Sequence, residues 1–396
     1  MKALVVGGGI GGLAAALSLH HAGLDVEVHE KSPVLAEVGA GIQVSPNGVK
    51  VLERLGLLDE LRAIAFEPEA LEMRMGQTGA AVFSIPIKAI AAQKYGAPYF
   101  HVHRADLHDL LARALQARAP SALHVGHAVE TITQGADGVE ARFTNGSRAG
   151  GDVLIGADGI HSVVRRALQG DEHPRFTGNV AWRLVVPATP DLRRLVPPNA
   201  CIWVGPGRHA VTYYLRRGEL VNFVGVVERD SWREEGWTQK GSADELRADF
   251  AGFAPPVAAI LAQAGDCYRW ALHDRDPLAS WSAGRATLLG DACHPMLPFL
   301  AQGAVMAIED GWVLAQCLAS GTDPAQALLD YEAARKPRTA RVQMAARAQM
   351  GRYHQRTAAG RLVTYGPMWL AAKLLPGAVN SMQDWLYAFD VTSSRQ

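Results

Sequence analysis

A run of glycines near the start of the chain has the residue types and spacing needed to bind a nucleotide. Gly7, Gly9 and Gly12 form a G-x-G-x-x-G pattern between an apolar stretch over 3–6, typical of a strand, and a helical spacing over 13–21. Glycine allows a tight turn, lets the backbone approach a pyrophosphate closely, and lets the helix pack on the strand. The N-terminus of that helix then faces the phosphates. The pattern predicts a dinucleotide site at this turn.

Glu30 strengthens this interpretation. It closes a second predicted strand over 26–29, at about the distance expected for an acid that accepts hydrogen bonds from ribose hydroxyls. A glycine-rich turn followed by a surface glutamate is the plain alternative, but it does not explain why all these elements coincide. Strand, turn, helix and acid together predict that an adenine dinucleotide binds here, without separating NAD from FAD.

Two later motifs separate the two cofactors. One is an Asp-Gly motif at Asp158, within Leu154–Arg165, and the other is a Gly-Asp motif at Gly290 and Asp291. Together with the glycine turn they resemble, in the correct order, the fingerprints of the class A FAD-dependent aromatic hydroxylases, which have the p-hydroxybenzoate hydroxylase fold. The resemblance extends to about residue 350. It is closest to the branch of salicylate hydroxylase, 3-hydroxybenzoate 6-hydroxylase and 6-hydroxynicotinate 3-monooxygenase.

The resemblance implies which residues hold FAD. It places Asp291 at the ribityl and pyrophosphate region, Arg104 at the phosphates, and Gln43 in the segment beside the isoalloxazine. A salt bridge with a nearby aspartate is the alternative for Arg104. Gly303 and Ala304 lie near the start of a predicted helix, whose N-terminal amides would favour an anionic reduced flavin. The complete set of expected FAD-binding residues is Gly7, Gly9, Gly12, Glu30, Gln43, Arg104, Asp158, Gly290, Asp291, Gly303 and Ala304.

A histidine, a tyrosine and a proline are the candidates for catalysis. His209 and Tyr213 are four residues apart on a predicted strand, so both side chains point to the same face. This segment is similar to the family strand that supplies an active-site histidine and tyrosine, and Pro298 matches the family proline beside the flavin. A histidine can deprotonate a phenol, which makes the ring a stronger nucleophile. The alternative for His209 is a sheet histidine bonded to solvent or backbone.

The resemblance implies an oxidoreductase: a single-component, FAD-dependent monooxygenase that uses NADH or NADPH and O2 to hydroxylate a small aromatic compound, as in aromatic catabolism. The expected substrate is phenolic and carboxylated, and the expected oxidant is a flavin C4a-hydroperoxide. No second G-x-G-x-x-G marks a separate nicotinamide domain. Two alternatives stay open. One is the same flavin chemistry on a non-phenolic heterocycle, as in urate-type hydroxylation or epoxidation, and the other is a flavin-binding redox sensor without turnover.

The elements around these residues predict a Rossmann-like α/β domain with an inserted antiparallel sheet and C-terminal helices. Between about Val180 and Val227 the sequence changes to short alternating runs typical of antiparallel strands. After a strand from Thr287, helices are expected over 301–318, 324–334 and 335–354. The expected domains are an FAD-binding domain over 1–70, 99–178 and 275–350, a substrate domain over 71–98 and 179–274, and a C-terminal helical region over 351–396.

The composition argues against other functions. The 396 residues include 39 Lys plus Arg and 39 Asp plus Glu, so a formal net charge of zero favours neither nucleic acid nor an anionic membrane. The four scattered cysteines predict reduced packing residues, and the cluster of His101, His103 and His108 lacks a metal-ligand pattern. No export leader or bilayer-spanning stretch is recognisable. We expect a cytoplasmic monomer or homodimer whose partners are an aromatic substrate, O2 and NAD(P)H.

Overall fold

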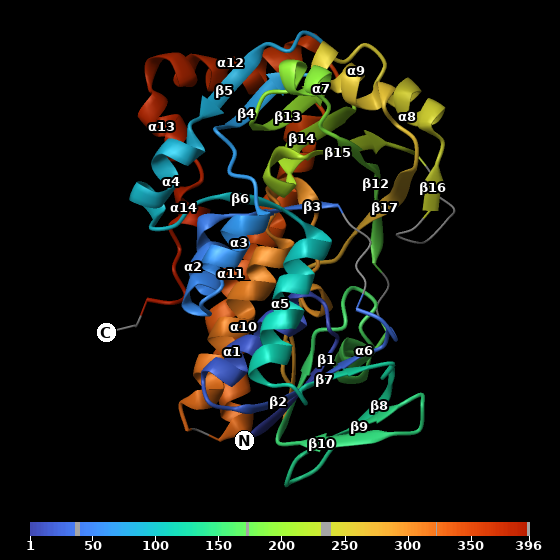
Figure 1. The fold of residues 1–396 in the computed structure, drawn as a ribbon, viewed down its shortest axis with the longest axis vertical. Coiled ribbons are helices and arrows are strands. Elements are labelled where there is room, and N and C mark those ends of the chain that lie inside the picture. The colour runs from blue at the N-terminus through green and yellow to red at the C-terminus, as the bar shows by residue number, and fades with distance from the viewer. Residues whose placement is uncertain (36–39, 172–173, 231–238, 322, 394–396) are drawn as a thin grey trace.

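A parallel sheet of five strands forms the layer that carries the glycine turn (Figure 1). The computed structural model describes residues 1–35, 40–171, 174–230, 239–321 and 323–393. The strand order is β18-β11-β1-β2-β7. Because the carboxyl ends of parallel strands meet at one edge of a sheet, the segments that follow β1, β11 and β18 come together. The bounds are β1 Lys2–Val6, β2 Asp25–Glu30, β7 Leu123–Val125, β11 Val153–Gly156 and β18 Ala286–Leu288.

Helices cover this sheet, and two of them pack very closely. A Cβ placed on Gly311 of α10 would lie 2.7 Å from the Cα of Ala15 on α1, so glycine is required at that crossing. The helices of this layer are α1 Ile10–His21, α2 Pro46–Arg54, α3 Leu58–Ile64, α5 Arg104–Arg118, α6 Val163–Gln169 and α10 Gly303–Ala319. A small antiparallel sheet of β8 Val129–Gln134, β9 Val139–Phe143 and β10 Arg148–Gly151 projects beside them (Figure 1).

A second sheet of eight strands forms the other layer, in the order β16-β17-β12-β15-β14-β13-β4-β5. All neighbours pair antiparallel except β13 and β4, which run parallel. Short helices α7 Pro190–Leu195, α8 Ala243–Asp249 and α9 Pro255–Ala262 cover its outer face (Figure 1). The strands are β4 Leu71–Met75, β5 Ala81–Ile85, β12 Arg175–Pro187, β13 Ala200–Gly205, β14 Arg208–Leu215, β15 Leu220–Glu228, β16 Gln239–Gly241 and β17 Cys267–Asp274.

A short two-stranded ribbon lies between the two layers (Figure 1). Gln43 on β3, Gly41–Val44, is paired with His101 on β6, Phe100–His103. This pairing brings the segment expected beside the flavin close to the start of α5, where Arg104 donates its backbone N–H to Ala40 at 2.9 Å.

One long helix, α11 Pro324–Tyr353, connects both layers. The two helices expected over 324–334 and 335–354 are therefore wrong, because the helix continues through Pro337. Ion pairs on both sides of the proline, from Arg335 and Arg338 to α10, stabilise the helix where the proline removes a backbone hydrogen bond. The helix expected from 301 begins at Gly303, because Pro298–Leu300 forms a 3-10 turn that ends in a left-handed Ala301.

The C-terminal part is helical, as expected. It contains α12 Ala358–Leu374, α13 Pro376–Asn380 and α14 Asp384–Tyr387, which lie beside α4 Ile87–Tyr95 and the outer strands β4 and β5 (Figure 1). No helix among the described residues is long and apolar enough to cross a bilayer. The mixed architecture confirms the expected fold class. The division into a discontinuous FAD-binding domain, a substrate domain and a C-terminal region stays a proposal.

Candidate active site

The glycine turn leaves no room for side chains at two positions and opens onto free space at a third. A Cβ on Gly12 would lie 1.9 Å from the carbonyl oxygen of Gly7. Gly7 has φ +108°, and a Cβ there would lie 2.4 Å from the carbonyl oxygen of Ala157. A Cβ on Gly9, in contrast, would meet nothing within 4 Å. The turn is thus closed against the neighbouring strand and open at Gly9, as a backbone must be to approach a pyrophosphate.

Glu30 is positioned at this turn by backbone donors. Its carboxylate accepts hydrogen bonds from the N–H of Gly8 at 2.7 Å and of Ser32 at 2.8 Å. His108 also contacts the turn, with Nε2 2.7 Å from the carbonyl oxygen of Gly8. The sequence indicated Glu30 at this turn, whereas it showed His108 only as one of three clustered histidines, because a histidine within a helix carries no local motif.

The Asp-Gly and Gly-Asp segments are joined by an arginine. The buried side chain of Arg165 donates to the carbonyl oxygens of Ile160, at 2.8 Å, and of Ala292, at 3.2 Å. Asp158 accepts hydrogen bonds from the hydroxyl of Ser162 and from the N–H of Val163, so its carboxylate caps α6. The structure therefore places Asp158 as a residue that shapes the loop against the glycine turn.

Three of the residues expected to hold FAD lie together at the start of α10. The side chain of Asp291 is exposed to solvent. Its Oδ1 lies 3.9 Å from where a Cβ on Gly303 would be. Desolvation by the surrounding protein raises the pKa of Asp291, while the positive charges of His294 and Arg104 lower it. Arg104 is thus close enough to interact electrostatically with Asp291. The start of α10, Asp291 and Arg104 form one polar recess.

The aspartates nearest to Arg104 in sequence pair with other arginines. Asp106 accepts two hydrogen bonds from Arg216, at 2.7 and 2.8 Å, and Asp109 pairs with Arg113 at 2.8 Å. The alternative in which Arg104 forms a salt bridge with one of these two aspartates stays open.

A buried ionic network lies directly behind the recess. Arg335 contacts Glu309 and Asp310, each at 2.7 Å, and Arg338 contacts Glu309 at 2.8 Å. His294 lies 2.5 Å from the second oxygen of Asp310. Neighbouring cationic side chains lower the pKa of both carboxyls against the effect of burial. Burial also opposes the charged form of His294, but its interactions with Cys293 and Asp310 hold its pKa well above the ordinary value. The network ties α11 and α10 to the Gly-Asp segment.

Cys293, His294 and Asp310 also have the spacing of metal ligands, with one donor atom each within 4.8 Å of the others. The arrangement does not favour a cation. Both oxygens of Asp310 are already occupied by Arg335 and His294, and burial raises the pKa of the Cys293 thiol. We interpret the three residues as part of the ionic network.

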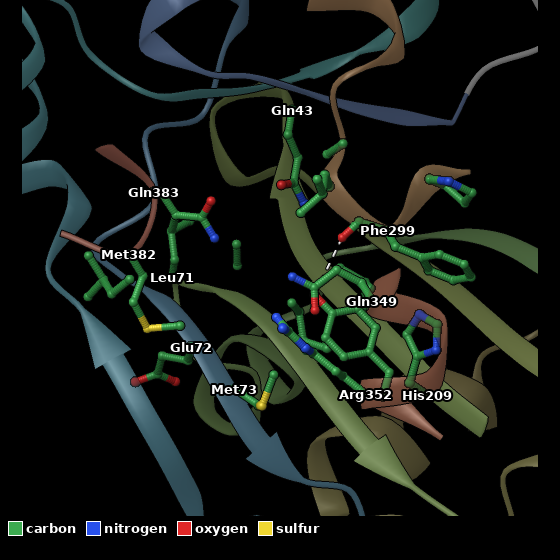
Figure 2. Close-up of a pocket in the computed structure, with 18 of the residues that line it drawn as sticks. Gln43, Leu71, Glu72, Met73, His209, Phe299, Gln349, Arg352, Met382 and Gln383 are labelled. Atoms are coloured by element: carbon green, nitrogen blue, oxygen red, sulfur yellow. Dashed lines mark hydrogen bonds between the residues drawn. The ribbon is translucent and has the colours of Figure 1, made fainter. Parts of the chain in front are cut away.

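A pocket opens between the inner face of the eight-stranded sheet, the 3-10 turn at Pro298 and the end of α11 (Figure 2). It contains about 1020 Å³ not filled by protein, with the solvent at its mouth included. Figure 2 shows the polar ends of Gln43, Gln349, Arg352 and Gln383 directed toward the space between them. The lining is otherwise mainly apolar, with Leu71, Met73, Ile202, Val211, Val224, Val226, Pro298, Phe299, Leu300 and Met382 among its members. Such a mixture is typical of a site for a small, partly polar molecule.

His209 lines this pocket and is almost completely buried. Its ring packs against those of Phe299 and Tyr353, with centroid distances of 5.3 and 5.0 Å. Its Nδ1 is 2.7 Å from Nε2 of His354. Burial, followed by the charge of His354, places the pKa of His209 well below the ordinary value, so the imidazole is neutral at neutral pH. The alternative of a histidine bonded to solvent or backbone does not describe this arrangement.

Tyr213 shares the sheet face of His209 but lies at its other end. Ala210 and Tyr214 belong to the outer core under α8 and α9, so His209, Val211 and Tyr213 face the opposite side. Along the strand the two predicted residues are about 13 Å apart. Tyr213 packs against Gly41 of β3, where a Cβ would come within 2.3 Å of its ring. Tyr213 is not among the residues that line the pocket. Gln43, on the same strand β3 as Gly41, does line it, and its Oε1 accepts a hydrogen bond from Tyr99 at 2.6 Å.

Comparison with known proteins gives consistent matches over most of the chain. A family model described as an FAD binding domain matches residues 1–346. The 3-amino-4-hydroxybenzoate 2-monooxygenase PtnB3 of Streptomyces platensis is 40% identical over 88% of each chain. The 3-hydroxybenzoate 6-hydroxylase of Polaromonas naphthalenivorans is 37% identical over 99% of this chain and 96% of its own. The structure of Klebsiella pneumoniae HpxO with FAD and uric acid is 30% identical in sequence, with a TM-score of 0.85. The match covers 98% of this chain and 97% of that one.

Proposed function

This chain belongs to the FAD binding domain family of aromatic-ring monooxygenases, and on that premise we propose that its substrate is a small phenol that carries a carboxylate. Bound FAD, once reduced by NAD(P)H, supplies the activation of O2, and the protein contributes binding, orientation and control of protons. The choice of a phenolic carboxylate is supported by relatives named for hydroxybenzoates and aminohydroxybenzoates. Cytoplasmic location and a monomeric or homodimeric state remain predictions.

The residues around the glycine turn fit the dinucleotide. The open space at Gly9 and the N-terminus of α1 suit the pyrophosphate, and Glu30 at the end of β2 suits the ribose. The recess of Arg104, Asp291 and the start of α10 supplies a cation, an anion and free N–H groups for the remaining polar parts of FAD. Ala304 and Gln43 would then border the isoalloxazine.

His209 is the residue that we propose removes the phenolic proton. It is neutral, it lines the pocket beside Pro298, and Nε2 is the nitrogen left for a substrate because Nδ1 is taken by His354. Phe299 and Tyr353, which pack against the His209 ring, limit the access of water, so a phenol that loses its proton to His209 stays activated. This neutral, pocket-lining histidine is the single observation on which the phenolic assignment rests.

Arg352 is the residue that we propose binds the carboxylate. It is the one arginine or lysine among the described residues that line the pocket, and Gln349 lies one helical turn before it on α11 (Figure 2). A guanidinium can donate two parallel hydrogen bonds to a carboxylate, which orients an aromatic ring as well as binding it. With the carboxylate at Arg352, the ring would extend between the sheet and Pro298.

The test is a screen for stimulated consumption of NADH and NADPH by the FAD-loaded protein, coupled to identification of the product. Hydroxybenzoates, aminohydroxybenzoates, hydroxynicotinates and urate form the panel. We expect a hydroxylated product from a phenolic carboxylate, and loss of that turnover in His209→Ala. Full turnover in His209→Ala would remove the assignment of the base.

A second candidate is hydroxylation of a non-phenolic heterocycle, favoured by the likeness to HpxO, which is solved with uric acid. Product from urate but from none of the phenolic acids would establish it. Binding of FAD with no stimulated NADH or NADPH consumption across the panel would instead support a redox sensor.

A further inference from the structure

A chain of hydrogen bonds leads from the substrate pocket to the protein surface. Nδ1 of His209 lies 2.7 Å from Nε2 of His354, and Nδ1 of His354 lies 3.1 Å from Oε1 of Glu228. Both histidines are at most 5% exposed, whereas the carboxylate of Glu228 is 28% exposed. The other oxygen of Glu228 is bound by Arg356, which is largely in solvent. The chain therefore has one end in the pocket and one end in water.

The carboxylate fixes the hydrogen positions along this chain. An ionised carboxylate only accepts hydrogen bonds, so Nδ1 of His354 must carry a proton and donate it to Glu228. Nε2 of a neutral His354 is then an acceptor, and Nδ1 of His209 must be its donor. This leaves Nε2 of His209 with a lone pair. Each ring is thereby set in the tautomer that allows a proton to enter at His209 and leave at Glu228.

We propose that His209, His354 and Glu228 form a proton relay that carries the phenolic proton of the substrate to solvent. The O–H bond of the phenol breaks as Nε2 of His209 gains a proton, and Nδ1 of His209 passes its own proton to Nε2 of His354. Nδ1 of His354 then protonates Glu228, which exchanges with water. The inference rests on the proposed function, since it requires a phenolic substrate, and it adds His354 and Glu228 as positioning residues.

The surroundings of the relay support transfer in this direction. Burial lowers the pKa of both histidines, so neither retains a proton at neutral pH. The titratable and charged groups that face the two rings are Tyr353 from α11, Glu228 from β15, and Arg356. Glu228 lines a surface depression, which is also lined by the charged residues Arg208, Arg229, Asp249 and Arg356. A proton that reaches Glu228 is therefore in a polar, hydrated place.

The experiment measures proton release directly. FAD-loaded protein in weak buffer with a pH indicator is mixed with 3-amino-4-hydroxybenzoate or 3-hydroxybenzoate in a stopped-flow instrument, and benzoate, which lacks the phenol, serves as the control. The variants are His354→Gln and Glu228→Gln, which keep hydrogen-bonding groups but cannot pass a proton on, and His354→Ala, which is tested with added imidazole. Glu245→Gln, whose carboxylate pairs with Arg269 in the same layer, is the matched control. FAD content, melting temperature and the Kd of benzoate are measured for each protein.

We expect proton release to slow by about tenfold or more in both relay variants, with FAD content and the Kd of benzoate unchanged. Glu245→Gln should keep the wild-type rate, and added imidazole should restore the rate of His354→Ala. Wild-type rates in both relay variants would overturn the relay while leaving the proposed function standing. If His354→Gln does not fold, Glu228→Gln, at a partly exposed position, decides the question. A wild-type protein that binds the phenols but releases no proton would overturn proton removal by His209, and the relay with it, while the product screen decides the proposed function separately.

Discussion

The guanidinium of Arg335 lies against the carboxylate of Asp310, with 2.7 Å between Nε and Oδ1 and both side chains closed off from solvent. Arg335→Met removes the cation and leaves Asp310 and Glu309 short of a partner. We expect the free energy of unfolding to fall by about 3–5 kcal/mol, because a buried charge without its partner is strongly destabilising. Arg113→Met, at an exposed pair on α5, should change it by less than about 1 kcal/mol. Urea unfolding of the three proteins compares them, and equal losses would contradict the role of the network.

A second prediction concerns the closed side of the glycine turn. Gly12→Ala places a methyl group 1.9 Å from the carbonyl oxygen of Gly7, so the first strand or helix must shift. We expect a loss of about 2 kcal/mol or more of stability, together with loss of FAD. Melting temperature and flavin absorbance of the purified protein report both effects. A stable, yellow Gly12→Ala protein would show that this contact is not required.

Gly9→Ala tests the open side of the same turn. Its methyl group meets nothing within 4 Å, and the extended φ of −73° suits alanine, so the stability of the apoprotein should stay unchanged. The methyl occupies the space assigned to the pyrophosphate, and we expect the Kd of FAD to rise by about tenfold, equal to about 1.4 kcal/mol. Titration of apoprotein with FAD measures this. Unchanged affinity would place the phosphates elsewhere.

His101 should make the protein sensitive to acid. Burial lowers its pKa to about 3, whereas a histidine in the unfolded chain titrates near 6.5. Between these values the unfolded state binds more protons, so stability falls as the pH falls, by up to about 1.4 kcal/mol per pH unit. Between pH 6.5 and pH 5, the free energy of unfolding of His101→Phe should therefore fall by up to about 2 kcal/mol less than that of wild type. His21→Asn, at an exposed position, should follow the wild-type curve, and parallel curves for all three would contradict the assignment.

Arg352 should separate carboxylated from uncharged substrates. Arg352→Met removes a charge-assisted hydrogen bond worth about 1.5–3 kcal/mol, so kcat/KM for a phenolic carboxylate should fall by about 10- to 100-fold. The same ring without its carboxylate should be affected far less. Arg352→Lys keeps the charge and should recover part of the loss. Equal losses of kcat/KM for the carboxylated and the uncharged substrate would argue for a structural role of Arg352.

The flavin-binding residues could be predicted from the sequence because the turn works through its backbone. A dinucleotide turn needs glycines at fixed spacing between a strand and a helix, and that requirement is contiguous in the chain. The structure indeed brings Gly7, Ala157 and Gly290 to one edge of the parallel sheet. Asp158 shows the limit of such motifs, because the pattern locates the residue while its carboxylate caps α6.

The substrate side was less predictable. His209 was found through its strand, but its partner His354 is 145 residues away in sequence, and no local pattern connects the two. Arg352 and Gln349 likewise reach the pocket only because α11 continues past Pro337. A proline within a helical stretch predicts a boundary, and the ion pairs of Arg335 and Arg338 with α10, which override it here, depend on tertiary contacts.

The unbroken α11 sets a constraint on how this protein can vary. Arg335 at the ionic network and Gln349 at the pocket are on the same helix, about 21 Å apart along its axis. Each residue turns an α-helix by about 100°, so inserting or deleting a single residue between them would swing Gln349, Arg352 and His354 away from the pocket while the network stayed in place. Substitutions along this stretch can be tolerated, whereas a change of length cannot. The number of residues between Arg335 and Gln349 is therefore as much a part of the active site as the side chains that line it.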